Sequence, residues 1–162
     1  MTRRESREKA IGLLFERSFD YERTPEEIMA DAKEEREEKL SAFAKELFVR
    51  TDENMGDIDE KIARCADNWR IDRIGRVTLT ILRLAACEID FFPEIPIEIS
   101  VNEALELARK FDDEKSVAFI NGVLGKYAAG IEKPFAKQKP LSAEAEEDEP
   151  EENGDSEEVV SE

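Results

Sequence analysis

The chain of 162 residues contains no histidine, and this absence excludes several kinds of active site at once. Histidine is the most frequent general base in catalysis and a common ligand of zinc. Pairs of a serine or cysteine nucleophile with a histidine base are excluded as well. The carboxylates show no spacing that would build a catalytic cluster in their place. We therefore expect a protein that is not an enzyme and that uses no cofactor.

Cysteine is scarce, and Cys65 and Cys87 both occupy apolar positions of helical patterns. Such residues are usually buried and behave as small hydrophobic side chains, so we expect two reduced thiols. We find no secretory signal peptide that would favour a disulfide of an exported protein. These features predict a cytoplasmic protein.

Basic residues are outnumbered, with 24 Lys and Arg against 41 Asp and Glu, and the net charge of −17 is unevenly distributed. Residues 134–162 contain eleven acidic residues against Lys137 and Lys139, which is a net charge of −9. This segment is rich in Glu, Asp, Ser and Pro and has no aromatic residue after Phe135. The composition predicts one domain, residues 1–133, followed by a disordered acidic tail, residues 134–162.

Long apolar runs are rare, and the longest one, residues 74–92, defines the centre of the expected fold. Its apolar residues occupy most of the circumference of a helix, which predicts a helix covered by others in a core. The run is as long as a bilayer span, but two arginines and two acidic residues interrupt it. A membrane-spanning helix is therefore not expected.

The rest of the sequence shows helical periodicity and no strand pattern, so we predict an all-α fold with about seven helices. Thr24 with Glu27 and Ser100 with Glu103 have the spacing of capping boxes, and Asp72 is expected to cap the central helix. Gly122 and Gly125 lie within the last expected helix. Glycines inside a helix predict the close approach of a neighbouring helix. The expected helices cover residues 3–19, 25–38, 41–55, 57–69, 74–92, 100–111 and 115–129.

Four blocks of sequence, in this order and spacing, resemble the NusB family of bacterial transcription antitermination factors. The blocks are RLAACEI at 83–89, IP at 95–96, VNEALELARKF at 101–111 and FINGVL at 119–124. The resemblance extends back through Ile58, Asp59 and Trp69 to the arginine-led first helix, and covers roughly residues 3–130. The chain departs from the family in having Cys87 where tyrosine is frequent, fewer basic residues at the N-terminus and a more acidic turn before the last helix.

The resemblance implies a fold of two three-helix bundles, with the N-terminal helix joining the first. It also implies binding to the boxA sequence of ribosomal RNA leaders together with NusE, which is also a small-subunit ribosomal protein. The assembly helps RNA polymerase to read through terminators, and its NusB component occurs as a monomer or a homodimer. The alternative is a NusB-like protein-interaction module without RNA specificity of its own, since related domains are fused to ribosomal RNA methyltransferases.

The resemblance places RNA contacts at the N-terminal arginines and around the turn at residues 112–116. Cations can bind phosphates and flat side chains can stack on unpaired bases, and the start of the last helix presents backbone N–H groups. Structural alternatives exist for each: the arginines could be a solvated face, the phenylalanines could be core, and the serine could be a helix N-cap. The candidate RNA-binding residues are Arg3, Arg4, Arg7, Phe111, Lys115, Ser116 and Phe119.

Overall fold

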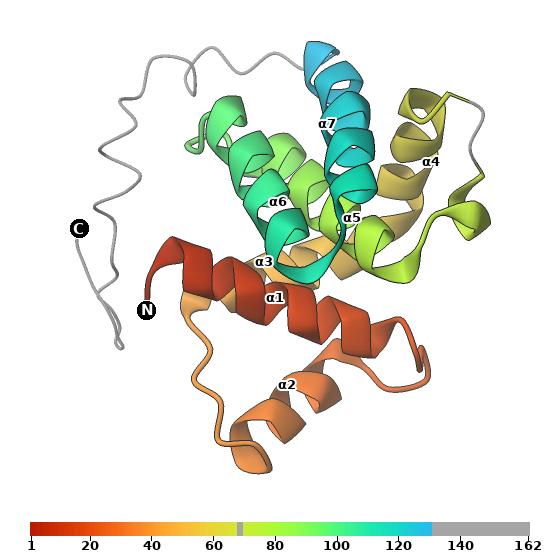
Figure 1. Ribbon diagram of the computed structural model, residues 1–162. Coiled ribbons are helices and arrows are strands. Elements are labelled where there is room, and N and C mark those ends of the chain that lie inside the picture. Colours follow the sequence, from red (N-terminus) through yellow and green to blue (C-terminus); the bar gives the residue numbers. More distant parts are fainter. Residues whose placement is uncertain (68–69, 131–162) are drawn as a thin grey trace. The chain divides into compact units, whose positions relative to one another are not determined.

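The computed structural model describes residues 1–67 and 70–130, and within these ranges all regular structure is helical (Figure 1). The prediction of an all-α fold with seven α-helices is confirmed for this part of the chain. Trp69 and the acidic tail predicted for residues 134–162 lie outside the described residues. The elements are α1 (Arg3–Arg17), α2 (Pro25–Glu34), α3 (Ala42–Glu53), α4 (Met55–Cys65), the 3₁₀ turn η1 (Ile71–Arg73), α5 (Arg76–Phe91), α6 (Ile97–Phe111) and α7 (Glu114–Ala129).

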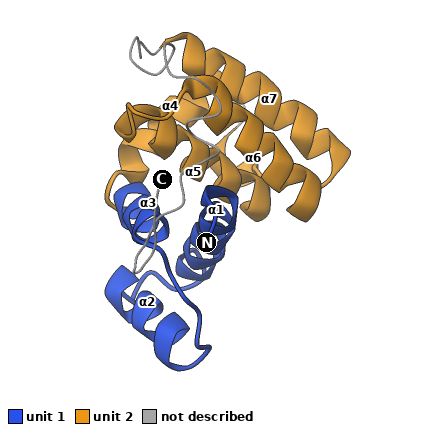
Figure 2. Cartoon of the chain, turned by 90° about the vertical axis from the view of Figure 1, so that its left-hand side faces the viewer, with its two compact units in different colours: residues 1–52, 142–162 blue, residues 53–141 orange. Residues whose placement is uncertain are grey.

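The described residues form two compact units, with the boundary after Asp52 (Figure 2). The first unit contains α1, α2 and nearly all of α3, and the second contains α4 to α7. The resemblance implies a first group of four helices and a second group of three. In the structure the first unit has three helices and the second has four. The difference concerns α4, which contacts α5 and α7 and so belongs with the second unit.

In the first unit, local sequence sets the start of two helices. Thr2 and Glu5 form a capping box at α1, and Thr24 and Glu27 form the predicted one at α2. Each box satisfies two backbone N–H groups that a helix start would otherwise leave unpaired. The three helices bury an apolar core that includes Ala10, Leu13, Leu14, Ile28, Ala44, Leu47 and Phe48.

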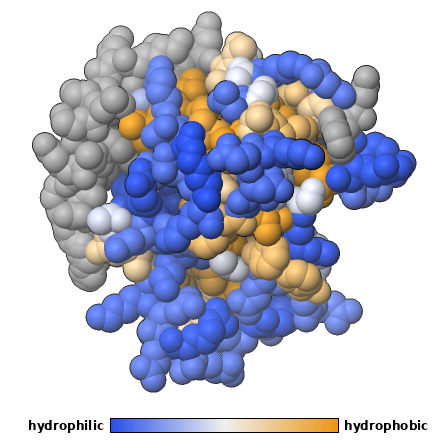
Figure 3. Space-filling model, in the orientation of Figure 1, coloured by the Kyte–Doolittle hydropathy of each residue, from blue (hydrophilic) through white to orange (hydrophobic). Residues whose placement is uncertain are grey.

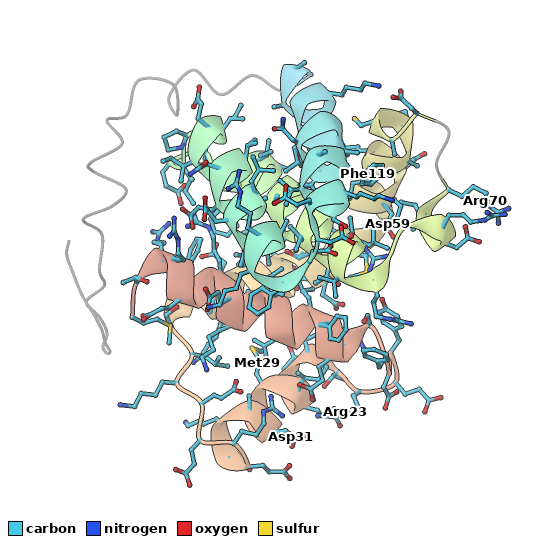
Figure 4. The ribbon with its side chains drawn as sticks, viewed as in Figure 1. Arg23, Met29, Asp31, Asp59, Arg70 and Phe119 are labelled. Atoms are coloured by element: carbon cyan, nitrogen blue, oxygen red, sulfur yellow. The ribbon has the colours of Figure 1, made fainter. Side chains whose placement is uncertain are left out.

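In the second unit, α5 is the core helix, as its apolar run predicted. It contacts α4, α6 and α7, and Ile81, Leu82 and Ile89 on it are fully buried. Two of the charged residues that interrupt the run, Arg83 and Asp90, have partners on α4. The Arg83 guanidinium donates two hydrogen bonds of 2.8 and 2.7 Å to the carboxylate of Asp59, which Figure 4 labels.

Three predicted helix starts in the second unit are wrong. Ser100 does not cap α6, because the helix begins at Ile97; the Ser100 hydroxyl lies within hydrogen-bond distance, 2.7 Å, of the buried carboxylate of Glu88. Asp72 lies inside η1, and Gly75 takes the N-cap position of α5. The third of these helices, α4, begins at Met55 and not at Asp57. Packing explains the change at Ser100, since the buried carboxylate of Glu88 requires a hydrogen-bond donor that the core must supply.

Tyr127 joins α7 to α5 through a hydrogen bond. This hydrogen bond should make the free energy of unfolding depend on pH in the alkaline range. Its hydroxyl donates to Asp90 Oδ2 over 2.6 Å, and the same oxygen lies 3.2 Å from Lys61 Nζ on α4. Burial, together with this hydrogen bond, raises the pKa of Tyr127 above its ordinary value of 10.0.

We expect the stabilising contribution of Tyr127 to be complete below about pH 10 and to be lost as the pH rises further. The reason is that the unfolded chain releases the phenolic proton at a lower pH than the folded chain. Urea denaturation at about pH 9 and about pH 11 should show a smaller loss of stability for Tyr127→Phe than for the unmodified protein. Equal losses in both proteins would contradict this account.

The two glycines of α7 do not mark a close helix crossing, and that prediction is wrong. A Cβ atom added at Gly122 or Gly125 would meet nothing within 4 Å, and both residues are exposed. Gly125→Ala should therefore raise the free energy of unfolding by about 1 kcal/mol, the difference in helix propensity. Ala118→Gly, also exposed on α7, is the matched control and should lower it by a similar amount in thermal denaturation. A destabilised Gly125→Ala variant would show that this face is packed after all.

Candidate nucleic-acid interface

The turn between α6 and α7 is ordered by its own two aspartates. Asp113 is the N-cap of α7, and its carboxylate accepts a hydrogen bond of 2.8 Å from the backbone N–H of Ser116. The hydrogen bond from Ser116 lowers the pKa of Asp113. The alternative in which Ser116 caps the helix is therefore wrong. The backbone N–H of Ser116 already donates to Asp113. The side chain of Ser116, not its N–H group, is the part that could contact a ligand.

Thr78 on α5 fixes the same turn from the side. Its hydroxyl donates a hydrogen bond of 2.6 Å to Asp112 Oδ2 and lies 3.2 Å from the hydroxyl of Ser116. Thr78 could not be expected from the sequence, because it lies within an apolar helical run and belongs to no motif. This contact holds the turn against α5 and orients Ser116.

An aromatic ring and lysines lie on the solvent side of this turn. Phe111 is 46% exposed, so the alternative in which it belongs to the core is wrong. Its ring centroid lies 5.4 Å from Lys110 Nζ, and Lys115 is exposed at the start of α7. Phe119, labelled in Figure 4, lies one turn further along α7 and is half-buried. An exposed ring with nearby cations is suited to stack on an unpaired base while the cations neutralise its phosphates.

The N-terminal arginines belong to the first unit and differ in exposure. Arg4 is exposed, Arg3 is half-buried and Arg7 is only 2% exposed. The guanidinium carbons of Arg3 and Arg7 lie 4.0 and 5.5 Å from the ring centroid of Phe43 on α3. Such cation–π contacts stabilise a fold, particularly when they are shielded from water. Within this unit Arg4 is therefore the most accessible arginine of the three, and Phe43 is a partner that the sequence did not reveal.

The described residues provide no support for two other classes of site. Among residues 1–67 and 70–130, no group of three or more Cys, Asp or Glu side chains is placed to hold a metal ion. Within the same ranges, every helix is too short or too polar to cross a membrane.

Comparison with known proteins identifies the family. The NusB family model matches residues 4–129. The chain is 41% identical over 137 residues to the transcription antitermination protein NusB of Natranaerobius thermophilus, covering 82% of this chain and 99% of the relative. The corresponding protein of Bacillus licheniformis is 43% identical over 133 residues, covering 82% of this chain and all of the relative.

Solved structures agree with the sequence relatives. NusB from T. maritima superposes with a TM-score of 0.69 at 29% identity, covering 89% of this chain and 96% of that one. A chain from a crystal structure of the antitermination factors NusB and NusE in complex with double-stranded RNA superposes with a TM-score of 0.71 at 26% identity, covering 80% and 97%. From the family match and the relatives together, this chain belongs to the NusB family.

Proposed function

We propose that the protein is a transcription antitermination factor that binds boxA RNA together with NusE. It acts in the complex that lets RNA polymerase read through terminators in ribosomal RNA operons, and it does so in the cytoplasm by binding, without catalysis. The observation that carries the proposal is the exposed Phe111 ring between Lys110 and Lys115, on a chain that matches NusB proteins over nearly their whole length. The RNA-binding part is the domain proposed at residues 1–133.

The proposed roles of the site residues follow from their chemistry and exposure. Lys115 binds phosphate, since it is exposed at the turn, and Phe111 stacks on an unpaired base. The hydroxyl of Ser116 donates to the backbone of the RNA, and Phe119 supports the same surface. In the first unit, Arg4 binds phosphate, while Arg3 and Arg7 contribute positive charge from partly or fully buried positions.

Binding of labelled boxA RNA, compared with a scrambled sequence and measured with and without NusE at two salt concentrations, tests this proposal. We expect boxA to bind more tightly than the scrambled RNA and the affinity to fall as salt rises, because phosphate contacts release counterions. Equal binding of the two RNAs even with NusE present would refute it. Co-purification with NusE without any RNA preference would instead support the protein-interaction module.

The different exposure of two arginines provides a separate prediction. Arg4→Gln should reduce the salt dependence of boxA binding by about 0.7 in the slope of log K against log salt. It should change the free energy of unfolding by no more than about 0.5 kcal/mol, as is usual at exposed positions. Arg7→Gln should instead lower the free energy of unfolding by about 1–3 kcal/mol, because it removes a buried polar group from its partners.

Measuring both quantities for both variants separates the roles. A large loss of stability in Arg4→Gln, or none in Arg7→Gln, would contradict the assignment of Arg4 to RNA and Arg7 to packing.

A further inference from the structure

The segment between α4 and α5 carries a basic surface that lies outside the proposed boxA site. Arg70, Arg73 and Arg76 are all exposed, and Asp72 is the only acidic residue among residues 70–76. The segment therefore has a net charge of +2 in a chain whose net charge is −17. We call residues 70–76 the arginine segment.

The local fold presents this segment to solvent. The backbone N–H of Arg73 donates to the carbonyl of Arg70 over 2.9 Å, closing the 3₁₀ turn η1, in which residues three apart lie on the same side. Ile74 is buried and anchors the segment against the second unit. Figure 4 shows the side chain of Arg70 extending away from the helices, and the surface at that edge is hydrophilic in Figure 3.

The three arginines contribute little to the stability of the local fold. Arg70 pairs with Asp72 over 2.8 Å, but both side chains are more than half exposed, and such pairs contribute little. Arg76 is the first residue of α5, where a positive charge opposes the helix macrodipole, and the first turn of α5 contains no acidic residue. The net charge of +2 on these exposed residues is therefore suited to bind an external anion.

The arginine segment also adjoins the turn described above, within the same unit. Arg76 is two residues before Thr78, whose hydroxyl donates to Asp112 and lies 3.2 Å from the hydroxyl of Ser116. The chain thus leads from the arginines directly to the residues that hold the α6–α7 turn. Side chains two positions apart on a helix point to different sides, so the start of α5, not a shared helix face, links the arginines to the turn. An RNA strand that binds the turn and continues past the start of α5 would reach the arginines.

We propose that Arg70, Arg73 and Arg76 bind the phosphates of RNA nucleotides that flank the boxA element. The inference rests on the proposed function, because it extends the RNA surface beyond the turn. Arginine suits this role, since its planar guanidinium binds phosphate with two hydrogen bonds. The contacts supply affinity without sequence preference, because phosphates carry no base identity.

The test compares boxA RNA alone with boxA RNA extended on both sides by about ten uridines, a length within the range of single-strand binding sites. For the unmodified protein, we expect the slope of log K against log salt to be steeper for the extended RNA by about 2, or about 0.7 for each of three phosphates. The variant Arg70→Gln/Arg73→Gln/Arg76→Gln should lose this difference and keep its binding to boxA alone.

The matched control is Lys33→Gln/Arg36→Gln/Arg50→Gln, which removes the same amount of charge from residues of the first unit that belong to neither proposed surface. This control should keep the difference in salt slope between the two RNAs. Loss of the difference in the control would show that net charge causes the effect and would overturn the inference. Arg73→Gln alone, which should reduce the difference by about 0.7, serves if circular dichroism shows that the triple variant is unfolded.

The outcomes also separate this inference from the proposed function. If the unmodified protein binds boxA but the extension does not change the slope, the inference fails and the function stands. A triple variant that keeps the full difference overturns the inference as well. If boxA binds no better than a scrambled RNA with NusE present, the proposed function itself fails.

Discussion

Replacing Ile81 with alanine is expected to lower the free energy of unfolding by about 2–5 kcal/mol, because it opens a cavity in the centre of the second unit. Ile81 is fully buried on α5, and α5 contacts the other three helices of that unit. Close-packed interiors relax only partly around a deleted side chain, so the loss exceeds the hydrophobic transfer energy alone. Urea denaturation, followed by circular dichroism, measures the change.

Ile99→Ala is the matched control, since it removes the same atoms from a half-buried position on α6. Its cost should be clearly smaller than that of Ile81→Ala, because fewer packing contacts are lost. Equal costs at the two positions would contradict the placement of α5 at the centre of the second unit.

Reversing the charge of Lys115 is expected to weaken boxA binding about 10- to 100-fold, if Lys115 binds phosphate as proposed. Lys115 is the only basic residue among residues 112–116, which also contain Asp112, Asp113 and Glu114. Lys115→Glu removes a charged hydrogen bond, which contributes about 1.5–3 kcal/mol, and each 1.4 kcal/mol corresponds to about a factor of ten in Kd. Fluorescence anisotropy with labelled boxA RNA measures this change.

Lys33→Glu makes the same charge change at an exposed position on α2 and controls for net charge. It should change the affinity far less than Lys115→Glu, because Lys33 is not part of the proposed site, and the remaining effect of net charge should decrease at high salt. Similar losses in both variants would show that net charge, not a contact at the turn, governs RNA binding.

The two aspartates of the α6–α7 turn have a structural role that their sequence does not indicate. The carboxylate of Asp112 accepts from the hydroxyl of Thr78, and that of Asp113 accepts from the backbone N–H of Ser116. Both carboxylates are therefore engaged in hydrogen bonds that hold the turn. The cations beside these aspartates in the sequence are Lys110, whose Nζ lies 5.4 Å from the exposed Phe111 ring, and the exposed Lys115.

The exposure of the site residues shows where sequence periodicity stops being informative. Phe111 and Phe119 fit the apolar stripes of their helices equally well, yet Phe111 is exposed and Phe119 is half-buried. Arg4 and Arg7 likewise belong to the same N-terminal cluster of arginines. Arg4 is exposed, but Arg7 is almost fully buried near Phe43. The side of a helix that meets a neighbouring helix is set by tertiary packing, which a single helical pattern does not contain.

The sequence by itself determined the all-α class, the number of helices, the capping box at Thr24 and the central position of α5. These features depend on local spacing and on apolar content, which act over a few turns of the chain. Tertiary structure alone decided that Ser100 lies beside a buried Glu88, that Thr78 holds the α6–α7 turn and that Arg7 is buried while Arg4 is exposed. Each of these depends on contacts between residues of different elements, from 12 to more than 30 positions apart. Burial at such contacts, not local propensity, sets which polar groups find partners and which remain available to RNA.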